Sequence, residues 1–467
     1  MGQKKQPAAA PIGDPKKRRR VGFSAIDAEI EAKDCIKIYL VSSKEEVDAS
    51  SSFCIDPVDL NSFFGEDGKI YGYEGLKITI WVNSVSFHAY ADITYESTSD
   101  GGKGITDLKT DLQNIFAATL VESKDEFLQT FSTQRNFIRS IVSGGQVLQQ
   151  KTSNGHVASS DSNSVATSNV EVVRMVIGDT EAGPLYGQLI PLVFLLVDGG
   201  SPIDVTDPCW ELYLLIQKKI DHQGEEHSLL LGFAAAYRFY HYPDSSRLRI
   251  SQILVLPPYQ HKGYGRYLLE VLYDVAVSED VFDLTIEEPL DYLQHVRTCV
   301  DVQRLLIFEP IQQTVNEAVS HLKQGKLSKK TQIHRLVPPR SAIEDVQKSL
   351  KINKKQFLQC WEVLIYLGLS PADKYMDDFV GIILNRVRED ILGKDSGTSG
   401  KQVIPVESDY DQEMSFAMIR SQDGEVACTV QIMDESQANQ EEQLQKLVDE
   451  RVKEIKLVAE KVSSHSV

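Results

Sequence analysis

The sequence lacks long hydrophobic runs, paired cysteine motifs and clusters of histidine with cysteine. Its longest apolar run, Leu189–Val197, contains Pro191 and is far too short to cross a bilayer. The six cysteines show neither C-x-x-C nor zinc-ligand spacing, and stand at positions 35, 54, 209, 299, 360 and 428. No apolar stretch follows the charged N-terminus, so we expect no secretory signal. These absences argue against a membrane protein, a disulfide scaffold and a metal site, and they predict reduced thiols in the cytosol or nucleus.

Charge is unevenly distributed along the chain. The first 20 residues carry seven Lys or Arg and one Asp, so the net charge of −18 becomes −24 for the remainder. A body this acidic repels nucleic acid and attracts basic partners, although acidity also serves solubility alone. Pro15-Lys-Lys-Arg-Arg-Arg-Val21 resembles a monopartite nuclear import signal, with a solvated basic tail as the alternative.

Changes in composition divide the 467 residues into five segments, enough chain for about three domains. The third segment has six serines between Ser153 and Ser168 and no Phe, Trp or Tyr, which is typical of a linker or loop. The five are a disordered basic tail (1–20), an N-terminal α+β domain (21–142), this low-complexity segment (143–169), a sheet-containing domain (170–310) and a helical C-terminal region (311–467).

Several elements can be placed by their periodicity. In the fourth segment we expect strands at Leu189–Val197, Trp210–Gln217 and Leu229–Tyr242. In the last, Lys354–Leu367 has an amphipathic helical pattern. Gln437–Val462 places valine or isoleucine seven residues apart, which predicts a helix that either docks on its own domain or joins a coiled coil.

A glycine-containing loop, Gln260-His261-Lys262-Gly263-Tyr264-Gly265, lies between an expected strand and an expected helix. The strand, Arg249–Leu256, is apolar and β-branched, and the helix, Arg266–Ala276, has apolar residues at helical spacing. Such a loop lets backbone amides approach a phosphate at the helix N-terminus. It matches neither G-x-G-x-x-G nor a P-loop, so a tight turn without a ligand is the alternative.

A strand that ends in carboxylates follows this helix. Val281–Pro289 places Phe282, Leu284 and Ile286 on one face, and Asp283, Thr285 and Glu287 on the other. The order of strand, glycine loop, helix and acidic strand resembles the core of the GNAT acetyltransferases.

Four separated motifs resemble one family within that superfamily, the type B histone acetyltransferase catalytic subunits, in a plant-like form. They are Ser251-Gln252-Ile253, Leu256-Pro-Pro-Tyr-Gln260, Gly263-Tyr-Gly265 and Glu287-Glu288-Pro289. The resemblance extends in pieces from about Phe64 to the C-terminal helix. It implies an α+β fold with a GNAT-type mixed sheet as the catalytic core at 170–310.

The resemblance also implies where acetyl-CoA, the co-substrate, would bind. The backbone of Ile253, Leu254 and Val255 should run beside the pantetheine arm. The loop should hold the pyrophosphate through its amides, and Lys262 or Arg266 would add charge; its residues are Gln260, His261, Lys262, Gly263, Tyr264, Gly265 and Arg266. No metal is implied. Leu290 and Cys299 depart from the family pattern near the nucleotide end.

Acetylation of lysine requires a base, and the resemblance assigns that role to Glu287, at the carboxyl end of a strand beside the glycine loop. Glu288 is expected to be a second acid, one pleat further along on the opposite side unless the strand ends or bulges there. Asp198 follows the apolar run Leu189–Val197, where the family also carries a carboxylate. A single carboxylate at a strand end is otherwise most often a solvated residue.

Two groups of residues are candidates for substrate binding. The loop with Glu66, Asp67 and Gly68 resembles the family's acidic loop that meets the histone tail. The second group consists of aromatic and basic residues on expected strands, namely Trp210, Tyr237, Arg238 and Phe239, of which Arg238 departs from the small polar residue common in the family. Aromatic walls bury a lysine's methylene stem and favour its cation, whereas core packing is the alternative for about half of these side chains.

The sequence therefore predicts a type B histone acetyltransferase that modifies lysines in the tail of free, newly made histone H-four. The family implies a WD-repeat histone-binding chaperone as partner, and residence in nucleus and cytoplasm. Two alternatives remain: a GNAT enzyme for N-termini or small amines, and a non-enzymatic histone-binding scaffold. Retention of Gly263, Gly265 and Glu287 argues against the scaffold.

Overall fold

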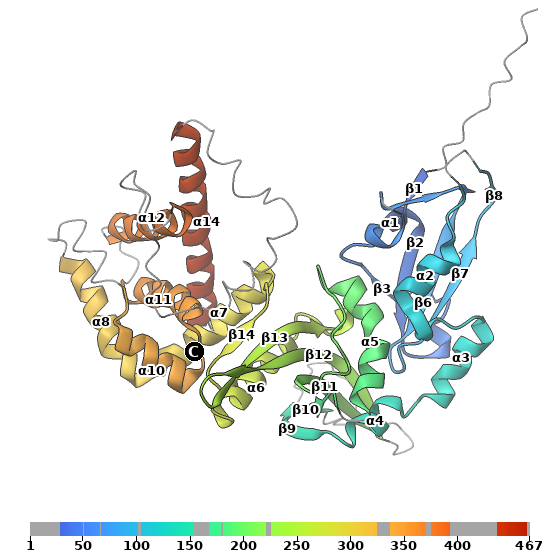
Figure 1. Ribbon diagram of the computed structural model, residues 1–467, viewed down its shortest axis with the longest axis horizontal. Helices are drawn as coiled ribbons and strands as arrows, with labels where there is room; N and C mark the ends of the chain where they lie inside the picture. The colour runs from blue at the N-terminus through green and yellow to red at the C-terminus, as the bar shows by residue number, and fades with distance from the viewer. Residues whose placement is uncertain are drawn as a thin grey trace, which may run out of the picture. The chain divides into compact units, whose positions relative to one another are not determined.

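A computed structural model describes ten stretches of the chain (Figure 1), namely 29–49, 51–65, 67–100, 104–153, 168–178, 181–220, 226–324, 337–369, 375–392 and 437–464. The basic tail at 1–20 lies outside them. The chain forms two compact units, the first comprising Met1–Arg135 and Gln188–Ser201, the second Asn136–Gly187 and Pro202–Val467. Within the described residues, no helix is long and apolar enough to span a membrane, and no group of three His, Cys, Asp or Glu is placed to hold a metal.

The first unit is built on a four-stranded sheet of order β3-β2-β6-β7. Its strands are β2 (Ile36–Val41), β3 (Phe53–Ile55), β6 (Lys77–Asn83) and β7 (Ala89–Thr94). β2 and β6 run parallel, and alternate residues such as Ile38 and Ile80 are buried. Helix α2 (Leu108–Phe116) contributes Leu108, Leu112, Ile115 and Phe116, at helical spacing, to the same core.

Shorter elements complete this unit. They are β1 (Glu29–Glu31), α1 (Ala32–Cys35), η1 (Lys44–Glu46), η2 (Asn61–Phe63), β4 (Lys69–Tyr71), β5 (Tyr73–Glu74), β8 (Ser97–Thr98), η3 (Ala117–Thr119) and α3 (Lys124–Thr133). Helix α3 is N-capped by Ser123, whose hydroxyl accepts from the amide of Glu126 at 3.2 Å. Strands and helices mix as expected for an α+β domain.

The second unit is built on a six-stranded sheet of order β14-β13-β12-β11-β10-β9. Its strands are β9 (Gln146–Ser153), β10 (Ser168–Val176), β11 (Trp210–Ile220), β12 (Glu226–His241), β13 (Ser245–Val255) and β14 (Leu284–Ile286). Neighbours are antiparallel except β13 and β14, which are parallel. Parallel strands require a crossover, and α6 (Tyr264–Ser278) supplies it after the short η4 (Pro257–Tyr259).

Helix α6 lies against this sheet (Figure 1). Its buried residues Leu268, Leu269, Leu272 and Ala276 pack with alternate residues of the strands, among them Ala234, Ala236, Leu248 and Ile250. Helix α4 (Phe137–Val142) packs against β12. The expected mixed sheet with a helix after the glycine loop is therefore present.

Two expectations about this part of the chain are wrong. The apolar run Leu189–Val197 is not a strand, because helix α5 occupies Ala182–Leu196. Leu185, Leu189, Leu192, Val193 and Leu195 are all buried, so the run has no polar face from which its period can be read. The expected linker at 143–169 instead contains β9 at its start and the first residues of β10 at its end. β9 is the edge strand of this sheet and β10 is its neighbour, while residues 154–167 of the expected linker lie outside the described residues.

The C-terminal region is helical, as expected, and part of it joins the core beneath α6. Its helices are α7 (Asp291–Leu306), α8 (Glu309–Gln324), α10 (Arg340–Leu350), α11 (Lys354–Leu369), α12 (Met376–Leu392) and α14 (Gln437–Ser464). Val448, Ile455 and Val462 of α14 are buried against these neighbours. Helix α14 thus docks on its own unit.

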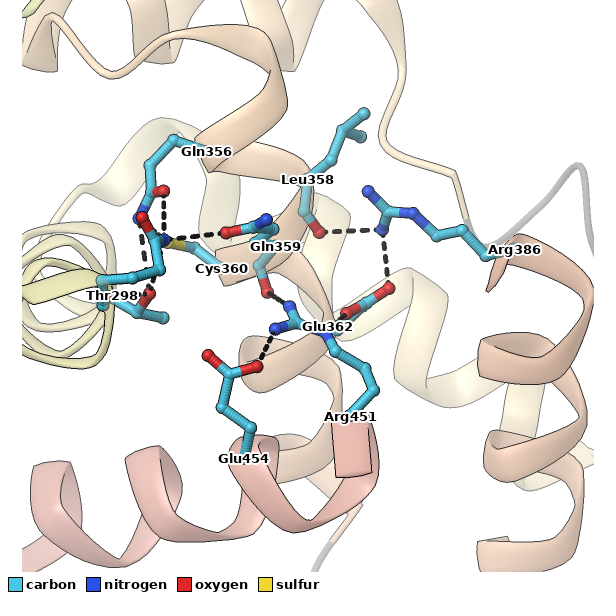
Figure 2. A network of polar contacts seen from close by, with 10 residues as sticks. Thr298, Gln356, Leu358, Gln359, Cys360, Glu362, Arg386, Arg451 and Glu454 are labelled. Carbon is cyan, nitrogen blue, oxygen red and sulfur yellow. Dashed lines mark hydrogen bonds and ion pairs between the residues drawn. The ribbon is translucent and has the colours of Figure 1, made fainter. Parts of the chain in front are cut away.

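A buried carboxylate joins three of these helices (Figure 2). Glu362 on α11 accepts from Arg386 Nη1 of α12 at 2.8 Å and from Arg451 Nε of α14 at 2.9 Å. Arg451 also donates to Glu454 and to the carbonyl of Gln359. Two guanidinium groups compensate one desolvated charge, which is the condition under which a buried carboxylate is tolerated.

Candidate active site

Strands β13 and β14 separate toward their carboxyl ends. Their register ends at Ile250↔Ile286, after which the amide of Glu287 donates to the carbonyl of Ile250 at 2.9 Å. β13 continues to Val255, whereas β14 has already ended. The edge of β13 from Ser251 to Val255 therefore faces a gap instead of a neighbouring strand.

A β-bulge determines which groups of β13 face this gap. Ala236 pairs with Ile250 and Ala235 with Gln252, so Ser251 is an extra residue without a partner on β12. Beyond the bulge, the amide of Leu256 donates to Leu231 on the β12 side at 2.9 Å. Because alternate residues point opposite ways, the amides of Ile253 and Val255 point into the gap, and that of Leu254 points toward β12.

The glycine loop ends at the N-terminus of α6, one side of the same gap. Gly263 is the N-cap residue with φ +82°, no side chain caps the helix, and a Cβ at this position would meet nothing within 4 Å. The amide of Tyr267 bonds to Gly263 at 3.0 Å, so the three preceding amides have no acceptor within the helix. Unpaired amides, a helix N-terminus and open space suit a pyrophosphate group.

Several polar side chains of the loop form hydrogen bonds with other protein groups, which stabilise its conformation. Gln260 Nε2 donates to the carbonyl of Val255 at 2.9 Å, and Lys262 Nζ to that of Pro258 at 3.0 Å. Arg266 donates to Glu270 at 2.7 Å and to Gln303 on α7 at 2.6 Å. Backbone amides, rather than these cations, are therefore the groups that the structure offers to a phosphate.

Glu287 lies at the mouth of the gap. Its side chain is exposed, and its Oε2 accepts from the hydroxyl of Ser251 at 2.8 Å. Glu288 is also exposed and has φ +37°, an unusual value for a residue other than glycine. The chain thus turns sharply after Glu287. The strand ends at Ile286, before Glu288, which is the alternative that the sequence left open.

The opposite end of this strand pair is closed by buried charges. Arg247 on β13 donates to both oxygens of Asp283, at 2.6 and 3.1 Å, and burial raises the pKa of Asp283 despite the attraction of Arg247. Arg297 on α7 donates to the carbonyl of Leu284 at 3.1 Å. The polar face expected for Asp283 and Thr285 is therefore buried, because α7 and neighbouring segments cover a strand that alternation placed at the surface.

Three aromatic residues form a row on one face of β11 and β12. Trp210 and Tyr237 are register partners with ring centroids 5.0 Å apart, and Phe239 lies 4.5 Å beyond Tyr237. All three are partly exposed, unlike core residues. The hydroxyl of Tyr237 donates to Asp207 at 2.8 Å, and this carboxylate raises the pKa of Tyr237 to about 12.

Arg238 is not part of this row, because adjacent residues of a strand face opposite ways. Its guanidinium donates to Glu211 at 2.8 Å and to Glu279 at 2.6 Å, and Arg174 contacts the same two carboxylates. Burial opposes ionisation of Glu211, but donors from Arg238, Tyr213 and Arg174 hold its pKa below the ordinary value. Arg238 thus ties the sheet to the end of α6, which corrects its expected role in substrate binding.

The remaining predicted residues belong to the first unit. Asp67 accepts from the hydroxyl of Tyr71, and Gly68 has φ +73°, with a Cβ that would collide with Asn61. Glu66 lies outside the described residues. Asp198 is exposed and follows α5.

The sequence assigns no role to three polar residues that contact the predicted site residues or their neighbours. These are Ser251, which bonds Glu287, Asp207, which bonds Tyr237, and Tyr186, whose hydroxyl donates to Gln252 Oε1 at 3.0 Å. Their contacts join residues that are far apart in sequence. The one local signal was the Ser251-Gln252 pair within a recognisable motif.

Comparison with known proteins places two segments in families. Residues 28–198 match the family model "Histone acetyl transferase HAT1 N-terminus", and residues 202–295 match "Acetyltransferase (GNAT) family". Type B histone acetyltransferase catalytic subunits are similar over nearly the whole chain. The protein from Arabidopsis thaliana is 58% identical over 99% of this chain and 98% of its own length, and that from Zea mays 48% over 99% and 97%. One from Dictyostelium discoideum is 26% identical over 72% of this chain and 65% of its own length.

The α+β fold, the glycine loop before α6 and the matched segment together define a GNAT acetyltransferase, a class that uses acetyl-CoA. The similarity outside that segment is more specific. The chain belongs to the family of type B histone acetyltransferase catalytic subunits.

Proposed function

We propose that the protein transfers the acetyl group of acetyl-CoA to lysine side chains in the tail of free, newly synthesised histone H-four, with Glu287 as the general base. The observation that carries this proposal is the position of Glu287. Its exposed carboxylate stands where β13 and β14 separate, on the same gap as the amides of β13 and the N-terminus of α6.

The chemistry follows from these groups. A model lysine has a pKa of about 10.4, so only about one in a thousand is a free amine at neutral pH. The carboxylate of Glu287 accepts one ammonium proton, and the lone pair left on Nζ attacks the thioester carbon. The amide of Ile253 or Val255 donates to the oxyanion as the C–N bond forms and the C–S bond breaks. The sulfur of coenzyme A leaves as a thiolate and, through solvent, takes the second proton from the attacking nitrogen, which becomes the amide. No covalent enzyme intermediate forms.

Charge and aromatic surface support a basic tail as substrate. The chain carries −24 outside its first 20 residues, and Trp210 and Tyr237 offer partly exposed rings to an alkylammonium group. The ring of Phe239 already has the guanidinium of Arg249 over it, 4.7 Å from the ring centroid. The acidic loop around Asp67 supplies a further attraction. By family membership, the proposal includes a WD-repeat histone-binding chaperone as partner, residence in nucleus and cytoplasm, and import through the basic segment Lys16–Arg20.

Incubation of the pure protein with acetyl-CoA and free core histones, read by mass spectrometry, tests this function. We expect acetylated lysine side chains in the tail of histone H-four. Glu287→Gln should lower turnover by ~10²–10⁴-fold while leaving acetyl-CoA affinity unchanged, because shape is retained and proton acceptance is lost. Acetylation confined to α-amino groups would contradict the substrate. A loss below about threefold would reject Glu287 and favour Glu288 or Asp198.

A further inference from the structure

An exposed glutamate needs an orienting partner if it is to accept a proton from a defined direction. Glutamate has three rotatable side-chain torsions, and a displacement of about 1 Å from the productive geometry is enough to slow a reaction about 100-fold. Within the described residues, the side chain of Glu287 has one hydrogen-bond donor, the hydroxyl of Ser251 at 2.8 Å. This contact therefore sets the direction of the carboxylate.

The bulge in β13 explains why a serine can reach Glu287. As the extra residue, Ser251 has no partner on β12, and it follows Ile250, whose carbonyl accepts the amide of Glu287. The same short segment thus bonds both the backbone and the side chain of Glu287. In a regular strand, the register would continue without an unpaired residue at this position.

The residue on the other side of Ser251 is also fixed. Gln252 is buried, and its Oε1 accepts from the hydroxyl of Tyr186, which in turn accepts from the amide of Ile203 at 3.1 Å. Tyr186 is fully buried. Ser251 therefore lies between two neighbours that are held by hydrogen bonds, Ile250 and Gln252, so the backbone position from which its hydroxyl projects is fixed.

We propose that Ser251 is a positioning residue for the reaction: its hydroxyl holds Oε2 of Glu287 and leaves Oε1 as the oxygen that accepts the proton of the substrate ammonium. A carboxylate has lone pairs enough for both contacts. This inference rests on the proposed role of Glu287 as base. Ser251 itself exchanges no proton with the substrate.

Steady-state kinetics of four variants beside Glu287→Gln, with histone and acetyl-CoA varied separately, test the proposal. Ser251→Ala should lower kcat by ~10–100-fold, the range for loss of a hydrogen bond to a charged group, and change the KM for acetyl-CoA by less than about twofold. Ser251→Thr keeps the hydroxyl and should recover kcat to within about threefold. Ser245→Ala makes the same substitution at the far end of β13 and should behave as the parent protein.

The fourth variant, Glu287→Gln combined with Ser251→Ala, separates this inference from the proposed function. If Ser251 acts through Glu287, the second substitution adds less than about twofold to the loss caused by the first. A parental kcat for Ser251→Ala, or full additivity in the double variant, would overturn the positioning role while Glu287 remained the base. A parental kcat for Glu287→Gln would remove the base and this inference with it. Unchanged thermal unfolding of Ser251→Ala shows that the comparison is between folded proteins.

Discussion

The two ends of the β13–β14 pair are built on opposite principles. At the closed end, Arg247 and Asp283 form a buried, doubly hydrogen-bonded ion pair, and the ring of Phe282 stacks on His241 at 3.8 Å. At the open end, Glu287 is exposed and Ser251 is partly exposed. Buried charges fix the strand at the closed end, and solvent-accessible groups remain at the end where we propose that the substrate enters. Because β14 is short, the buried ion pair at its start is needed to hold the exposed Glu287 in place after its end.

The largest predicted effect is a loss of stability at the closed end. Asp283→Asn keeps the shape of the side chain but leaves Arg247 without its charge partner. Removing one member of a buried pair typically costs ~3–5 kcal/mol, so the free energy of unfolding should fall by about that amount in urea titrations. Glu287→Gln is the matched control, an acid-to-amide change four residues along at an exposed position, and should leave the unfolding midpoint unchanged. Equal midpoints for both variants would show that the ion pair adds no stability.

The buried carboxylate of Glu362 allows a second test of whether buried ion pairs contribute to stability in this protein. Glu362 is held by Arg386 and Arg451 (Figure 2), and Arg451→Met removes one of the two. Because Arg386 remains, we expect the smaller cost of a lost charged hydrogen bond, about 1.5–3 kcal/mol in unfolding free energy. Limited proteolysis should show faster cleavage within α14, while turnover of the remaining folded protein stays parental. A reduced turnover at full folding would instead connect α14 to the site.

At the open end, the backbone of Gly263 supplies a test of intermediate size. Its φ of +82° is unfavourable for a branched residue, by about 1–2 kcal/mol. Gly263→Val should therefore weaken acetyl-CoA binding by ~5–30-fold in calorimetry and leave histone binding unchanged. Gly381→Val, on helix α12, is a substitution at a second position where a Cβ has open space, and it should not affect cofactor affinity. Unchanged affinity in Gly263→Val would mean that the loop is only a turn.

The same comparison shows what the sequence could reveal. Local patterns were sufficient to predict the strand, glycine loop and helix around Gly263, because apolar periodicity and glycine placement depend only on residues close together in the sequence. Motifs of the family also placed Glu287 at the end of β14. Periodicity gave wrong predictions where an element is buried on all sides. Helix α5 lacks a polar face, and Asp283 and Thr285 are covered on the side that alternation assigned to solvent.

Contacts between distant segments were the other source of error. The bulge at Ser251 is a property of the pairing with β12, so no pattern within β13 indicates it. The sequence groups Arg238 with the neighbouring aromatic residues as a substrate contact, but its partners Glu211 and Glu279 lie 27 and 41 residues away. These contacts depend on register and topology, which a single sequence does not specify.

The smallest predicted effect concerns the acidic loop, in which Asp67 is exposed. Glu66→Lys combined with Asp67→Lys should raise the apparent KM for the histone tail several-fold and flatten its dependence on salt, without changing the KM for acetyl-CoA. Acidic side chains at a protein surface attract a polybasic tail over the ~8–10 Å that physiological salt leaves unscreened. Each such contact contributes only ~0.2–1 kcal/mol, far less than the buried pair at Asp283.

A control for this measurement must change net charge equally. Glu122→Lys combined with Asp125→Lys alters two exposed acids elsewhere in the same unit by the same four charges. If both double variants raise the histone KM alike, net charge alone attracts the tail and the loop has no special position. If neither does, substrate capture depends on the aromatic row of Trp210, Tyr237 and Phe239. An effect of the loop variant alone, declining as salt increases, would show that exposed charges guide the substrate while buried charges hold the strand that carries the base.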